Sequence, residues 1–198
     1  MSTESQRDRL ARCQKEVDEN PQKASAYYNL GLALTISGKV RTADEAYAKA
    51  VEIDPGFVKA WVNLGGVRML HWEFQGCLEA NQEAVRLQDD LAIAHFNMGQ
   101  AYLYLNDPEN LVKCNQRVLE IDRDHARAHY YAAVGFLALN DLGAAERHLG
   151  RAMDLGHSPT QDFVKAMEKA HTKKFHQQQS QTLIEITGDK SPESNKEE

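Results

Sequence analysis

Two histidines one helical turn apart are the best candidates for metal chemistry in this sequence. His125 and His129 are four positions apart, which places both imidazoles on one face of a helix. A closed zinc site takes about four ligands, and this pair supplies two of them. We therefore predict no metal site and no cofactor, with metal binding by His125 and His129 as the minor alternative.

Signatures of catalysis are also absent. The sequence contains no phosphate-binding loop, no dinucleotide-binding glycine motif, no HExxH zinc motif and no nucleophile elbow. Its cysteines are Cys13, Cys77 and Cys114, which are odd in number and far apart. Such cysteines form no disulfide framework, which is typical of a reducing compartment. We therefore predict a cytoplasmic protein that is not an enzyme.

The composition argues against a nucleic-acid partner and against a membrane span. The chain has 198 residues, of which 42% are hydrophobic and 26% charged, and its formal net charge is -6. A nucleic-acid partner usually requires a basic face, so we expect none. No apolar run approaches the length of a membrane span, and the polar N-terminus lacks the apolar segment of a signal peptide.

An internal repeat in the sequence predicts the helices that position the other candidate residues. Gly31, Gly65 and Gly99 are spaced 34 residues apart, and the same period recurs in an asparagine series and an alanine series. These two series are Asn29, Asn63 and Asn97, and Ala26, Ala60, Ala94 and Ala128. A fixed period of this length is the mark of a helix–turn–helix solenoid, which has an extended groove and usually no catalytic pocket.

Each period contains signals for two antiparallel helices. In the first period, apolar residues recur at helical spacing up to Leu34, and Gly38 then interrupts the pattern as expected of a turn. A second apolar face follows through Tyr47, and Pro55 with Gly56 ends that helix. The period predicts four repeats, at residues 24–57, 58–91, 92–125 and 126–159. The repeated glycines are expected where two helices cross closely.

The residues at these positions resemble the tetratricopeptide repeat family. The resemblance rests on Tyr27, Leu30, Gly31, Ala43, Tyr47, Ala50 and Pro55 in the first repeat, and on Trp61, Leu64, Gly65, Cys77 and Ala84 in the second. The fourth repeat matches least well, because His129, Ala132 and Ala133 replace the tryptophan, leucine and glycine of the family. The resemblance implies an all-α, right-handed helix–turn–helix solenoid. It also implies that His95 and His129, both in the tryptophan position, pack between helices.

The two ends of the chain are predicted to close the solenoid. Residues 1–23 read as an N-terminal capping helix, and residues 160–175 as a C-terminal capping helix with Phe163 and Met167 on its apolar face. Residues 176–198 are polar and predicted to be a disordered tail, in which 182–187 alternates like a short strand. The tail is either an inert terminus or a motif that docks on a partner or in the groove.

In tetratricopeptide proteins the first helix of each repeat lines a concave groove. The residues carried over to that groove as partner-binding candidates are Tyr28, Asn29, Lys59, Val62, Asn63, Phe96, Asn97, Gln100, Tyr104, Arg127, Tyr130 and Tyr131. The three asparagines resemble ladders that hold a peptide backbone, and the alternative is that they bond a neighbouring helix. The aromatic residues are candidate anchors, although the sequence does not separate anchors from core residues.

The resemblance also excludes one family function and leaves two. A carboxylate clamp for acidic chaperone tails needs lysine and arginine in groove positions that here hold Tyr28, Leu32 and Ile93. We predict a non-enzymatic scaffold that binds a peptide segment or helix of an unidentified protein, with Lys59 and Arg127 favouring an acidic flank. The alternative is a self-assembling protein or an accessory subunit, with the C-terminal tail docked in the groove of a homo-oligomer.

Overall fold

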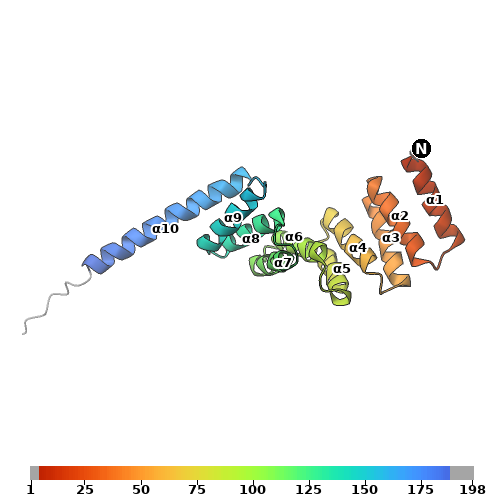
Figure 1. Cartoon of the computed structure of the whole chain (residues 1–198), viewed down its shortest axis with the longest axis horizontal. Helices are drawn as coiled ribbons and strands as arrows, with labels where there is room; N and C mark the ends of the chain where they lie inside the picture. Colours follow the sequence, from red (N-terminus) through yellow and green to blue (C-terminus); the bar gives the residue numbers. More distant parts are fainter. Residues whose placement is uncertain (1–4, 188–198) are drawn as a thin grey trace, which may run out of the picture.

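The computed structural model describes residues 5–187, and helices account for all of its regular secondary structure in that range. The helices form pairs that stack along one elongated array (Figure 1). Their bounds are α1 (Gln6–Glu19), α2 (Ala24–Ile36), α3 (Val40–Ile53), α4 (Val58–Leu70), α5 (Phe74–Leu87), α6 (Ala92–Tyr104), α7 (Pro108–Ile121), α8 (Ala126–Ala138), α9 (Leu142–Asp154) and α10 (Gln161–Thr187). The predicted all-α solenoid of helix pairs is confirmed.

The same turn joins the two helices of every pair. After α2, the N–H of Gly38 donates to the Thr35 carbonyl (3.0 Å) and the N–H of Lys39 to the Leu34 carbonyl (2.9 Å). This pattern ends a helix with one residue in the left-handed region, which glycine and asparagine tolerate best. The left-handed residues of the four turns are Gly38, Trp72, Asn106 and Asn140, with φ between 55° and 72°.

Within a pair, the helices approach so closely that only glycine fits at the crossing. A Cβ atom on Gly31 would lie 2.6 Å from the ring of Tyr47, and one on Gly99 would lie 2.7 Å from the Asn115 amide. A Cβ atom on Gly65 would collide with the Asn81 amide in the same way. The predicted close crossings at these glycines are therefore present in three consecutive repeats.

Both ends of the array are covered by a further helix. Helix α1 buries Cys13 and Val17 against the first repeat, and α10 buries Phe163 and Met167 against the last. Among the described residues, no helix is long and apolar enough to cross a membrane.

Helix α10 departs from the predicted boundary at residue 175. It continues to Thr187, so residues 176–187 of the predicted polar tail, including the strand-like 182–187, are helical. The physical reason is that no glycine or proline occurs between Gln161 and Thr187, and most residues there are good helix formers. Figure 1 shows the second half of α10 extending beyond the body of the solenoid. Residues 188–198 lie outside the described part of the chain.

Candidate functional site

A hollow of about 530 Å³ lies between α2, α4 and the start of α6. Its walls are mainly apolar or aromatic, with two amide side chains and one lysine. The lining residues are Tyr28, Gly56, Phe57, Val58, Lys59, Val62, Asn63, Gln88, Leu91 and Ile93. We call this surface the α2–α4–α6 hollow. It brings together four of the predicted groove residues, namely Tyr28, Lys59, Val62 and Asn63.

The floor of this hollow is ordered by contacts between repeats. The ring of Tyr28 lies 4.9 Å from that of Phe57 and 5.9 Å from that of Tyr47. The side-chain amide of Asn63 donates to the Tyr28 hydroxyl at 3.4 Å, which joins the first repeat to the second. A carboxamide has two donors and an acceptor, so Asn63 can bond to Tyr28 and still pair with a peptide backbone.

The rim of the hollow is exposed and carries little charge. Lys59 and Ile93 stand at the starts of α4 and α6, and both side chains are exposed. Lys59 is the only charged residue among those that line the hollow in the described structure. An apolar cleft with a few placed polar groups is the usual form of a ligand site, and a volume of this size lies within the usual range.

Four other predicted groove residues gather between α6 and α8. The guanidinium of Arg127 lies over the rings of Phe96 (4.9 Å) and Tyr131 (5.9 Å). The Gln100 amide donates to the Tyr131 hydroxyl at 3.4 Å. Phe96 is only 4% exposed, so it is a core residue. Arg127 and Tyr131 of the following repeat cover the Phe96 ring, and a partner cannot use it as an anchor.

Two further candidates are also buried. Asn97 is 8% exposed, and its amide donates to the Asn81 carboxamide oxygen at 3.2 Å. Asn97 therefore bonds a neighbouring helix, which was the alternative to holding a peptide backbone. Tyr130 is 8% exposed, because Phe163 packs against its ring and its hydroxyl lies 3.1 Å from that of Thr160. Helix α10 thus covers the groove position that Tyr130 was predicted to supply.

The remaining candidates lie apart from one another. Asn29 is exposed on α2, and Tyr104 is exposed at the end of α6. Tyr104 belongs to an aromatic cluster with Trp72 and Phe74, which the sequence reasoning did not single out. The available signal was a tryptophan at the turn position where the other repeats carry glycine or asparagine.

The histidines do not converge on a metal site. His125 caps α8, with its Nδ1 accepting the Ala128 N–H at 3.0 Å. His129 instead pairs with His148, at 3.1 Å between their Nδ1 atoms, and its Nε2 lies 3.2 Å from the Arg123 carbonyl. No group of three or more histidine, cysteine or acidic residues in the described chain is arranged to hold a metal ion.

Comparison with known proteins identifies the repeat in two segments of the chain. The tetratricopeptide repeat model matches residues 24–57 and 92–125, and the match to a solved tetratricopeptide structure covers 89% of the chain. Residues 24–57 and 92–125 of the chain are tetratricopeptide repeats. A comparison with curated proteins finds no match.

Three solved structures illustrate the likeness of fold. The structure of YrrB, described as a tetratricopeptide protein with an unusual peptide-binding site, is 18% identical with a TM-score of 0.72, and the match covers 89% of this chain and 93% of that one. MamA from Desulfovibrio magneticus RS-1 is 19% identical with a TM-score of 0.71, covering 76% and 85%. PilF from Pseudomonas aeruginosa is 15% identical with a TM-score of 0.70, covering 93% and 87%. At these identities the tetratricopeptide fold is what the proteins share.

Proposed function

We propose that this tetratricopeptide protein is a non-enzymatic interaction scaffold that binds a peptide segment or helix of another protein. The α2–α4–α6 hollow carries the proposal, because it is the place where predicted groove residues form an open cleft. Its ligand is an apolar segment flanked by an acidic residue. Tyr28, Phe57 and Val62 bury the apolar side chain, Asn63 pairs with the peptide backbone, and Lys59 attracts the acid.

The rest of the molecule is consistent with recognition as its activity. The net charge of -6 disfavours a nucleic acid as the partner. Burial raises the pKa of the Cys77 and Cys114 thiols to about 11, so neither is poised as a nucleophile. All three cysteines are unpaired, which supports a reducing compartment such as the cytoplasm.

Peptide selection with a variant of the hollow tests the proposal. Random peptides displayed on phage are selected on the wild-type chain and on the Lys59→Glu/Ile93→Ala variant. Both residues are exposed, so this variant keeps its fold. The matched control is Lys39→Glu/Met153→Ala, which changes a lysine and a large apolar residue at exposed positions outside the hollow.

We expect the selected peptides to combine apolar and acidic residues, and to lose about tenfold or more in affinity on the hollow variant alone. Equal binding to wild type, hollow variant and control would place the binding site elsewhere. Failure to select any peptide on the wild-type chain would refute the proposal.

A further inference from the structure

A row of exposed apolar side chains follows the turns between the paired helices of the last three repeats. We call it the turn edge and define it as residues 71–75, 105–109 and 139–143, with the helix ends Leu70 and Tyr104. Its exposed large apolar residues are Leu70, Trp72, Tyr104, Leu105 and Leu139. Contiguous exposed apolar surface on a folded chain marks an interaction site.

The centre of the turn edge is a preordered aromatic cluster. The rings of Phe74 and Tyr104 stack at 4.8 Å, and Trp72 meets Tyr104 edge-on at 5.4 Å. Trp72 nevertheless remains 69% exposed and Tyr104 52% exposed. Rings that are already held by one another lose little entropy when a partner covers them, which is a property of binding hot spots.

The backbone conformation of Trp72 indicates that its side chain has a function other than stabilising the turn. Trp72 has φ of 64°, and the equivalent turn positions hold Gly38, Asn106 and Asn140. The left-handed region disfavours bulky residues and is tolerated by glycine and asparagine. A strained and exposed tryptophan, at a position where the chain otherwise uses the favoured residues, points to a function of the indole ring.

The turn edge is also acidic. Its three turns contain Glu73, Asp107, Glu109 and Asp141, and neither lysine nor arginine. Asp107 caps α7, and its hydrogen bonds with Asn110 hold the pKa of its carboxyl below the usual value, so it is ionised at neutral pH. The partner of this surface must therefore combine an apolar anchor with positive charge.

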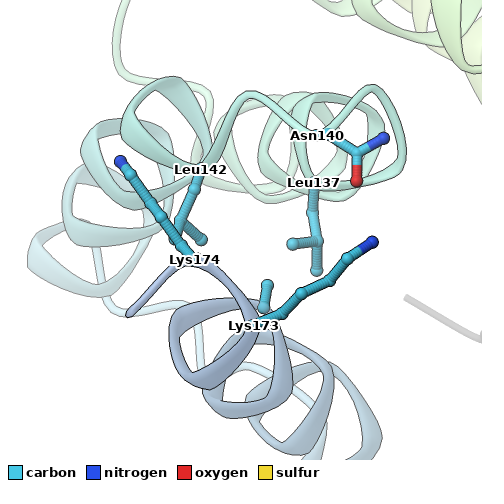
Figure 2. Close-up of a pocket in the computed structure, with 6 residues that line it drawn as sticks. Leu137, Asn140, Leu142, Lys173 and Lys174 are labelled. Atoms are coloured by element: carbon cyan, nitrogen blue, oxygen red, sulfur yellow. The ribbon is translucent and has the colours of Figure 1, made fainter. Parts of the chain in front are cut away.

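Helix α10 of the same protein has that chemistry. Residues 164–176 contain four lysines and a single glutamate, and they present Phe175 at 56% exposure. Helix α10 reaches the turn edge of its own molecule only at the last repeat, where Lys173 and Lys174 line a hollow with Leu137, Asn140 and Leu142 (Figure 2).

From there α10 leads away from α4 and α5 and out of the solenoid (Figure 1). The 13 residues that follow Lys174, up to Thr187, extend it by about 20 Å.

We propose that the turn edge receives α10 of a second copy of this chain. Phe175 of one copy packs on Trp72 and Tyr104 of the other, and the lysines of α10 face Glu73, Asp107 and Glu109. This contact is separate from the α2–α4–α6 hollow and does not depend on the function proposed for it. Two copies that exchange the contact reciprocally form a closed dimer, and one-way contacts form an open chain.

Sedimentation equilibrium of the full chain tests the contact. The variants are Trp72→Asn, which introduces the residue that the next two repeats use, and Phe175→Ala, with Met153→Ala as a control at a comparably exposed residue of α9. We expect the wild type and the control to associate, more weakly as salt is raised. Each of the other variants should associate at least about tenfold more weakly. Trp72→Asn should unfold at the same temperature as the wild type or higher, because it relieves the left-handed strain.

A mixing experiment separates this contact from a general loss of structure. The Trp72→Asn chain keeps an intact α10, and the Phe175→Ala chain keeps an intact turn edge. An equimolar mixture of the two should therefore form mixed dimers at concentrations at which each variant alone is still monomeric. A wild type that is monomeric at every concentration refutes the proposal and leaves the turn edge to a basic, apolar segment of another protein. The proposal is also refuted if the Trp72→Asn variant associates as strongly as the wild type, or if the mixture forms no mixed dimers.

Discussion

Adjacent glycines on α4 provide a sharp test of how the helices pack. Gly65 faces Asn81, whose amide occupies the place of the missing Cβ, whereas a Cβ on Gly66 would meet no atom within 4 Å. Asn81 is fully buried and donates to the Cys77 carbonyl at 2.8 Å while accepting from Asn97 at 3.2 Å. It therefore cannot move aside without losing hydrogen bonds.

The expected energies have opposite signs at the two positions. Alanine in place of glycine in a helix gains about 0.5–1 kcal/mol, which is the full effect at Gly66. At Gly65 the overpacking costs about 1–3 kcal/mol, and disrupting the buried amide adds about 1–3 kcal/mol. After the helix gain is subtracted, Gly65→Ala should destabilise the fold by about 1–5 kcal/mol.

Urea unfolding followed by far-ultraviolet circular dichroism measures both effects. We expect Gly66→Ala to raise the midpoint and Gly65→Ala to lower it. Gly65→Ala acts on the packing of α4 against α5, so the same ordering should appear in thermal unfolding. If the two variants were equally stable, the close crossing at Gly65 would not exist as described.

Three further predictions concern buried polar groups. Asn97→Ala should destabilise the fold by about 1–3 kcal/mol, because it leaves the Asn81 carboxamide without a donor, and should not alter peptide affinity; urea unfolding and a binding titration check this. Burial, and next the positive charge of His129, lower the pKa of His148 in the fold. The unfolded state then binds more protons, so the free energy of unfolding should fall as the pH drops through about 6.5, and His148→Gln should flatten that decline in urea titrations from pH 7 to 5. Because burial raises the pKa of Cys114 to about 11, its alkylation at pH 8 should be slow in the native protein and fast in urea, as read by mass spectrometry.

The fold was predictable because packing imposes a period on the sequence. The glycines and alanines recur every 34 residues because each repeat crosses its helices at the same place, as Gly31 against Tyr47 shows. The length of α10 was readable from the absence of glycine and proline up to Thr187. The polar composition of that segment outweighed this signal in the prediction of a tail from residue 176.

The candidate site was less predictable, because equivalent positions meet different neighbours. Asn63 contacts the Tyr28 hydroxyl beside an open hollow, whereas Asn97, one period later, donates to a buried asparagine on α5 of the preceding repeat. Likewise Val62 lines the hollow while Phe96 lies under Arg127. The repeat pattern specifies which helix face a residue occupies, and only the three-dimensional neighbours decide whether a partner can reach it.

The most direct test of the central claim is an NMR titration of the isotope-labelled chain with a peptide selected on the wild type. We predict saturable shifts of the Asn63 side-chain amide and of backbone amides around Lys59 and Ile93, with little change near Trp72. Shifts confined to the turn edge, or to residues far from the α2–α4–α6 hollow, would contradict the account of this protein as a groove-binding scaffold.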